Sequence, residues 1–237
     1  MINFFRRIRK QLLAENKTGK YLKYAIGEIL LVMIGILLAL QVNNWNESEK
    51  QKNFANKILN AITISIKNNI VYYEFVIDYN EDGNQSAEII LNHLDKNLSY
   101  HDSLDVHFSK AIQYSTPIIR NAGYESLKSY GLSIIENDSI LDALEVYNDG
   151  FIETLVLRQE YYFSNTVLPI LTELFETVAI RSDMKPFDYD ELKNSRKYRS
   201  ILNTSIANRN DQNKWYKIWL QAVKDIEKMI DQELQNQ

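Results

Sequence analysis

The amino-acid sequence predicts an all-α protein with one membrane-spanning helix. Apolar residues recur at the helical period of 3.6 residues along most of the chain. Pro (3) and Gly (7) are too scarce for a turn-rich β sandwich or barrel. One segment near the N-terminus is apolar on every side. With 45% hydrophobic and 24% charged residues, the chain has the composition of a folded protein rather than of a disordered one.

Residues 1–20 are predicted to form a cytoplasmic, basic amphipathic segment. Its apolar residues recur at helical spacing with basic residues largely between them: Phe4, Phe5, Ile8, Leu12 and Leu13 against Arg6, Arg7, Arg9 and Lys10. Such a helix would lie in the inner leaflet against anionic lipids. The alternative is that the cations only fix the topology and that the apolar residues among them are incidental.

Residues 21–45 are predicted to be a transmembrane helix with its flanks. Between Ala25 and Val42, Glu28 and Gln41 are the only strongly polar residues. A helix of this length spans about 27 Å, close to a hydrocarbon core of about 30 Å. Aromatic residues stand at both ends, where belt residues belong: Tyr21, Tyr24 and Trp45. A cleaved signal peptide and a buried core helix are the alternatives, and the long basic stretch before the span argues against both.

The charges that flank this span predict its orientation. Seven cations and one glutamate precede it, whereas asparagine and glutamate follow it. The positive-inside rule therefore places the N-terminus in the cytoplasm and residues 46–237 outside. Residues 48–237 hold 20 basic and 28 acidic residues, a net charge of −8, so we expect no nucleic acid as a partner.

Small residues share one face of the predicted span. Gly27, Gly35 and Ala39 are separated by eight and four residues, and the last two form a small-xxx-small pair that would allow a second helix to approach. Such pairs also arise by chance in apolar helices. Glu28 lies one turn into the span; anchoring near the inner surface and proton or substrate handling are its alternative roles.

Residues 46–237 are predicted to form a single extracytoplasmic domain, a bundle of five to seven helices. A helix from Asn46 to Tyr79 would continue the membrane helix as a stalk, because no Gly or Pro separates the two. Asp188 or Asp190 is expected to cap a later helix, and the last helix carries an apolar face from Trp215 to Ile230. The other predicted helix ends, caps and breaks are at residues 81–84, Gly131, residues 137–139, residues 149–150, Pro169 and residues 208–212.

Two sequence blocks carry a resemblance to a known family. The first is Tyr24–Glu47, YAIGEILLVMIGILLALQVNNWNE, and the second is Tyr124–Asn137, YESLKSYGLSIIEN. They resemble an uncharacterised bacterial family of single-span membrane proteins, classed as a domain of unknown function. The resemblance implies the topology described above and a place in the bacterial inner membrane, with the domain on the periplasmic or extracytoplasmic side. It implies no activity and no site residues.

No pattern of residues predicts catalysis. The chain has no cysteine, and it lacks the glycine-rich and serine-centred signatures of nucleotide binding and hydrolysis. His93, His101 and His107 lie within 15 residues of one another near several aspartates, but none has the i, i+4 spacing of a helix-borne metal motif. Exposed loop residues are the alternative to a metal site there. We expect no enzyme activity, no cofactor and no metal.

Clustered aromatic residues leave two readings of function open. Tyr72-Tyr73, Tyr161-Tyr162-Phe163 and Trp215-Tyr216 with Trp219 suit either core packing or a partner or ligand surface. We predict a membrane-anchored interaction or scaffold protein that binds a protein partner or a second copy of itself. The alternative is an extracytoplasmic ligand-sensing module that signals laterally to a membrane partner; the small-molecule ligand is not identified by the sequence.

Overall fold

The computed structural model describes residues 18–179 and 182–236. Residues 1–17 of the predicted amphipathic segment, with Phe4, Phe5, Arg6, Arg7 and Arg9, lie outside these residues, as does the side chain of Tyr21. The chain divides into two units, Met1–Ala55 and Asn56–Gln237, and each is described by itself.

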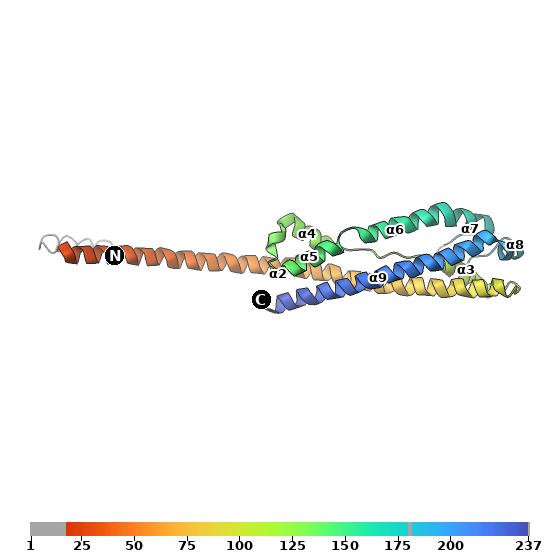
Figure 1. Ribbon diagram of the computed structural model, residues 1–237, viewed down its shortest axis with the longest axis horizontal. Helices are drawn as coiled ribbons and strands as arrows, with labels where there is room; N and C mark the ends of the chain where they lie inside the picture. The colour runs from red at the N-terminus through yellow and green to blue at the C-terminus, as the bar shows by residue number, and fades with distance from the viewer. Residues whose placement is uncertain (1–17, 180–181, 237) are drawn as a thin grey trace. The chain divides into compact units, whose positions relative to one another are not determined.

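In the first unit, helix α2 begins at Thr18, and its helical backbone continues to Asp95 in the second unit (Figure 1). Its apolar side chains between residues 22 and 42 are exposed on every face, as for Ile29 (67%) and Leu38 (61%). The most apolar 18-residue window of the helix has a mean hydropathy of 2.4, and none of it is buried in the protein. Among the described residues, this is the one helix that is long and apolar enough to cross a membrane.

In the second unit, α2 buries one stripe of its surface. Ile62, Ile66 and Tyr73 are at most 2% exposed, at the spacing that predicts an amphipathic helix. The predicted break at residues 81–84 is wrong, because the helix continues through them to Asp95.

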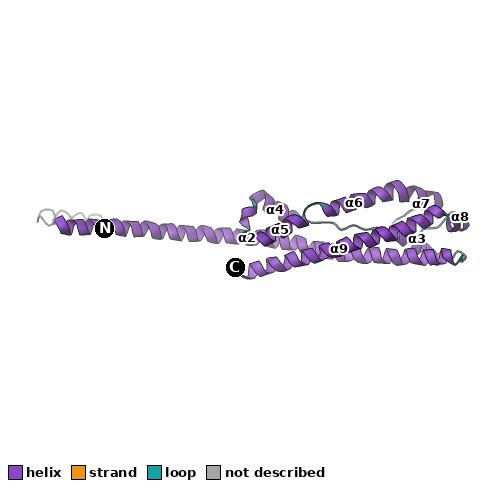
Figure 2. Cartoon of the chain, in the orientation of Figure 1, coloured by secondary structure: helices purple, strands orange, loops and turns teal. Residues whose placement is uncertain are grey.

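The remaining described elements are helices joined by loops, so the all-α prediction is confirmed (Figure 2). They are η1 (Asp102–Leu104), α3 (Asp105–Ile112), α4 (Ala122–Tyr130), η2 (Leu132–Ile134), α5 (Asp138–Tyr147), α6 (Phe151–Tyr162), η3 (Phe163–Val167), α7 (Leu168–Leu174), α8 (Tyr189–Asn194) and α9 (Arg196–Asn236). A single isolated bridge joins Phe175 and Pro186, and the described residues contain no strand.

Several predicted helix ends are confirmed. Asn137 caps α5 by accepting a hydrogen bond from the Ile140 amide, and Gly131 ends α4 at a φ of 111°. The chain leaves the helix between α5 and α6, at the predicted weak point that contains Gly150. Pro169 lies in the first turn of α7, directly after the π-helical segment η3. The predicted kink therefore takes the form of a local change of helical pitch.

Helix α9 runs antiparallel to the second half of α2 (Figure 1). Lys224 bonds Glu74 at 2.7 Å, Lys217 bonds Glu81 at 3.0 Å, and Arg199 pairs with Asp95, so residue numbers fall along α9 as they rise along α2. The predicted turn at residues 208–212 is wrong, since α9 is continuous from Arg196 to Asn236.

Helix α4 crosses α2 at very close range. A Cβ atom added to Gly123 would lie 2.6 Å from the backbone nitrogen and Cα of Ile62. The Gly123 amide also donates to the Ser65 hydroxyl at 3.4 Å. A side chain at position 123 would therefore force the two helices apart.

The second unit holds two apolar clusters rather than one continuous core. The first cluster includes Ile62, Tyr73, Leu127, Leu144, Tyr216 and Ile226. The second cluster includes Ala87, Ile90, Phe108, Phe175, Tyr198 and Leu202. Along both α2 and α9, the stretch that separates them carries polar side chains.

Candidate functional site

Buried polar side chains of α2, α6 and α9 form a polar layer between the two apolar clusters. Asn80 donates to the Asn213 side-chain oxygen at 2.9 Å, and Asn213 donates to the Ile77 carbonyl at 3.1 Å. Gln212 donates to Gln159 of α6 at 3.1 Å. All four of these polar side chains are buried, and the hydrogen bonds between them offset the free-energy cost of removing them from water.

Arg209 of α9 is also buried beside these residues in the sequence and is 1% exposed. Its guanidinium donates to four neutral oxygens, which come from α2 and from the end of α3: Asn84 Oδ1 (2.7 Å), Ala111 O (2.8 Å), Gln113 O (2.9 Å) and Gly83 O (3.2 Å). Burial lowers the pKa of Arg209 to about 10, which leaves the group charged at neutral pH. The layer thus holds a buried cation through neutral acceptors.

Gly83 is the residue of α2 that faces this cation. A Cβ at position 83 would lie 3.2 Å from both Arg209 Nη1 and the Lys110 carbonyl oxygen. Glycine costs about 1 kcal/mol relative to alanine inside a helix, so the close approach explains why it stands there. Asn84 adds an amide contact to Asn210 at 2.8 Å.

A pocket of about 530 Å³ opens in the second unit beside this layer. Helix α2, helix α3 with the residue that follows it, and the loop before α8 line it, through Phe75, Tyr79, Asp82, Val106, Ser109, Lys110, Gln113, Ser182 and Asp183.

Three polar side chains of the pocket are hydrogen-bonded in a chain. Tyr79 donates its hydroxyl to the Gln113 side-chain oxygen, and Gln113 donates to Ser109 at 2.9 Å. Ser109 donates to the Ala179 carbonyl at 3.3 Å. The backbone carbonyl of Gln113 also accepts from Arg209, so this residue belongs to both the pocket and the polar layer.

The rest of the pocket combines an aromatic surface with charge. The Phe75 and Tyr79 rings lie 5.7 Å apart, and Phe75 is 49% exposed. Lys110 forms an ion pair with Asp82 at 3.0 Å. Asp183, which is exposed, adds a second carboxylate, so the described lining residues carry a net charge of −1.

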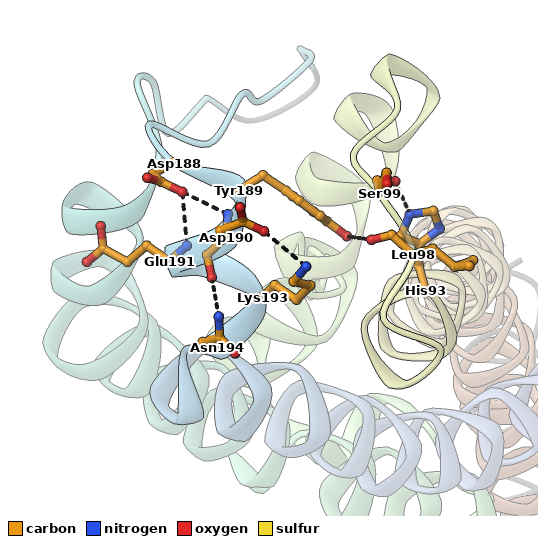
Figure 3. A network of polar contacts seen from close by, with 9 residues as sticks. All are labelled: His93, Leu98, Ser99, Asp188, Tyr189, Asp190, Glu191, Lys193 and Asn194. Carbon is orange, nitrogen blue, oxygen red and sulfur yellow. Dashed lines mark hydrogen bonds and ion pairs between the residues drawn. The ribbon is translucent and has the colours of Figure 1, made fainter.

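The structure does not gather the three histidines into a metal site. His93, near the end of α2, bonds the Ser99 carbonyl oxygen through Nε2 at 2.7 Å, and its ring meets the Tyr189 ring edge-on at 6.3 Å (Figure 3). His101 pairs with Ser103, and His107 Nδ1 lies 3.2 Å from the Ser86 hydroxyl. Within residues 18–179 and 182–236, no three ligand-type side chains lie close enough to share an ion.

Figure 3 also shows how α8 is held at this end of α2. Asp188 accepts hydrogen bonds from the amides of Asp190 (2.8 Å) and Glu191 (3.0 Å), as the sequence predicts for a helix cap. Tyr189 then donates to the Leu98 carbonyl at 3.4 Å. The group is a structural anchor for α8.

The predicted membrane residues that the structure describes lie on exposed parts of α2. Tyr24 is 53% and Trp45 70% exposed. Gly27, Gly35 and Ala39 are exposed as well, and a Cβ added at either glycine would meet nothing within 4 Å. Contact between two such helices stays a prediction.

The aromatic clusters are buried in part and exposed in part. Tyr73 and Tyr216 are fully buried in the first apolar cluster with their rings 6.1 Å apart, whereas Tyr161 of α6 is 72% exposed. Sequence reasoning missed Arg209 and Gly83, although both belong to polar stretches that it singled out as breaks.

Comparison with known proteins gives one match. Residues 28–145 match the model of a family described as "Family of unknown function (DUF6090)". This agrees with the resemblance to an uncharacterised domain, and the match covers most of the apolar segment and all of the block Tyr124–Asn137. No curated protein and no solved structure matches the chain.

Proposed function

We propose that this protein is a single-pass membrane protein of the bacterial inner membrane, with its N-terminus in the cytoplasm. Its helical domain would lie on the extracytoplasmic side and bind a protein partner. The proposed activity is binding, with no catalytic step and no cofactor.

The observation that carries this proposal is the exposure of residues 22–42. Large apolar side chains there are exposed on all sides, and none of the most apolar 18-residue window is buried by the residues that the structure describes. A helix that is hydrophobic all round needs a low-polarity medium, which a lipid bilayer provides. The basic stretch before the span and the acidic domain after it support the orientation.

Cysteine labelling in intact cells tests the orientation directly, because the chain has no cysteine of its own. Gly19→Cys is expected to react with a membrane-impermeant maleimide only after lysis. Ser48→Cys and Ser139→Cys, both at exposed positions, are expected to react in intact cells once the outer membrane is permeabilised. Labelling in the opposite pattern would reverse the proposed topology.

Helix α6 supports the partner-binding part of the proposal. Leu157 and Tyr161 lie one turn apart and are 65% and 72% exposed. Exposed apolar and tyrosine side chains are enriched at protein interfaces. A photoreactive amino acid at position 161 is expected to crosslink one dominant protein in membranes, and one at position 145, on α5, is expected not to. Equal, diffuse products from both positions would argue against this surface.

The pocket favours a second candidate function, ligand sensing. Its volume falls within the range of about 300–1,000 Å³ that small-molecule sites occupy. Sensing predicts that a small molecule raises the melting temperature of the purified protein. The sensing candidate fails if no compound in a chemically broad library shifts it.

A further inference from the structure

We propose that the pocket between α2 and α3 binds an organic monocation with an apolar or aromatic body. This rests on the second candidate function, that the domain binds a small ligand. The inference adds the charge and the shape of that ligand.

The charges of the pocket favour a cation. Among the lining residues that the structure describes, Lys110 is the one cation, and its ammonium already pairs with the Asp82 carboxylate at 3.0 Å. Asp183 is the charged residue of the described lining that does not take part in this pair, and it is exposed to solvent. An anion would meet a net negative charge on the described lining residues, whereas a cation would balance Asp183.

The uncharged lining favours an apolar or aromatic body. Phe75 and Val106 are 49% and 41% exposed and come from different helices, so their side chains form apolar walls. The Phe75 and Tyr79 rings lie 5.7 Å apart, and aromatic faces attract ammonium groups. Cation recognition by aromatic rings together with a carboxylate is stronger than either contact alone.

The remaining polar groups add little competition for this ligand. The side chains of Tyr79, Gln113 and Ser109 are already linked by hydrogen bonds that end on the Ala179 carbonyl. Part of their hydrogen-bonding capacity is therefore already used within the protein, which leaves less of it for a neutral hydrogen-bonding ligand. We therefore expect the pocket to select its ligand by charge and by contact with the aromatic rings.

Three probes that share a benzyl group and differ in charge test the inference on the full-length protein in detergent. Benzyltrimethylammonium is the cation, benzyl alcohol the neutral analogue and phenylacetate the anion. Isothermal titration and thermal unfolding are expected to show binding of the cation at least about tenfold tighter than of the other two, a difference of about 1.4 kcal/mol.

Two substitutions locate the site. Asp183→Asn and Phe75→Leu are each expected to weaken cation binding about three- to tenfold, the range for a carboxylate or cation–π contact at a partly exposed site. Asp142→Asn, at an exposed position of α5 outside the pocket, is the matched control and is expected to change nothing. Circular dichroism confirms that each variant is folded.

The outcomes separate the inference from the proposed function. Tighter binding of phenylacetate or benzyl alcohol, lost in Phe75→Leu, would overturn the cation assignment while supporting a ligand site. Cation binding unchanged by both pocket variants would place it elsewhere and overturn the inference. Binding of no probe, together with no stabiliser in a broad library, would overturn the ligand-sensing candidate itself.

Discussion

Residues 22–42 and residues 56–95 of helix α2 differ in where their apolar side chains lie. In the first segment such side chains are exposed on every face, as for Ile29 and Leu38. In the second, one stripe of them is buried against the helices that pack on α2, with Ile62 and Ile90 at most 2% exposed, while others such as Phe75 stay exposed. In residues 56–95, other helices of the protein cover the buried apolar stripe. In residues 22–42, the described residues do not cover the apolar side chains.

The two segments also treat polar groups differently. Residues 56–95 bury Asn69 and Asn80 completely and supply two oxygens to the buried Arg209. Each of these groups has a hydrogen-bond partner from another element. A bilayer offers no such partners, so polar residues inside the first segment are expected to be far more costly than those in the second.

The largest effect should follow from charges placed in the first segment. Ile34→Arg with Leu38→Arg adds about 2.5–3.5 kcal/mol per arginine to insertion at the centre of a span. We expect the double variant, synthesised with membrane vesicles, to be extracted by alkaline carbonate, whereas the wild type stays in the pellet. The control is Ser48→Arg with Gln51→Arg, at exposed positions outside the apolar run, which should remain in the pellet. Retention of both double variants would show that residues 22–42 do not span.

High pH should unfold the second unit and leave a lipid-surrounded first segment helical. Burial raises the pKa of Tyr73, Tyr198 and Tyr216 above the ordinary value of 10. Above pH 10 the unfolded chain loses these protons and the folded chain keeps them, so stability falls by about 1.4 kcal/mol per buried tyrosine per pH unit.

Circular dichroism and tyrosinate absorbance, followed together between pH 9 and 12, measure this transition. Helix loss and ionisation of the buried tyrosines are expected to coincide. Tyr216→Phe removes one of the groups and should make the pH dependence shallower. Ionisation that precedes helix loss would mean that the buried hydroxyls exchange with solvent in the folded state.

Arg209→Met should come next in size. The substitution leaves four oxygens without this donor, two of them in buried contacts and two in part-buried ones, and an unsatisfied buried group costs about 1–3 kcal/mol. We expect a loss of about 3 kcal/mol in urea unfolding of a fragment containing residues 46–237. Arg158→Met is the control, because its pair with Asp211 is exposed at 65% and 52% and such pairs contribute about 0–1 kcal/mol. Similar losses for both would contradict a specific role for the polar layer.

Gly123→Ala tests how closely the second segment of α2 is packed. The new Cβ would meet the Ile62 backbone at 2.6 Å, so α4 has to move, and overpacking of this kind costs about 1–3 kcal/mol. Ser129→Ala, at an exposed position two turns later on α4, should change stability by a few tenths of a kcal/mol at most. A neutral Gly123→Ala variant would mean that the crossing is loose.

The smallest expected effect is at the cap of α8. Asp188→Ala removes the acceptor for the amides of Asp190 and Glu191 and should cost about 1 kcal/mol. Asp188→Asn keeps an acceptor at the same place and should recover most of the loss. Hydrogen exchange at these two amides measures the effect directly, and unchanged protection in Asp188→Ala would show that the cap is redundant.

Local patterns predicted much of this fold. Helical periodicity identified the buried stripe of α2, and side-chain chemistry identified the caps at Asn137 and Asp188 and the helix end at Gly131. These features depend on neighbours in sequence, which the sequence displays. The exposed apolar segment was equally visible, since its signal needs no tertiary partner.

The two wrong breaks share one physical cause. Residues 81–84 and 208–212 have the polar and glycine composition of turns, yet both lie inside long helices. Tertiary contacts override the local preference because Arg209 bonds Gly83 and Asn84 across the interface. The pocket was not predictable for the same reason: its lining comes from residues as far apart as Phe75 and Asp183.

The glycine opposite Arg209 also limits how α2 and α9 can move within the second unit. A piston-like slide of one helical turn, about 5.4 Å, would bring the guanidinium opposite Tyr79 or Ala87 instead of Gly83. A Cβ at position 83 would already lie 3.2 Å from Arg209 Nη1, so neither neighbour offers the space that the glycine does. The contact between Gly83 and Arg209 thus fixes the axial position of α2 relative to α9. A motion transmitted through the two helices therefore has to be a joint rotation or tilt.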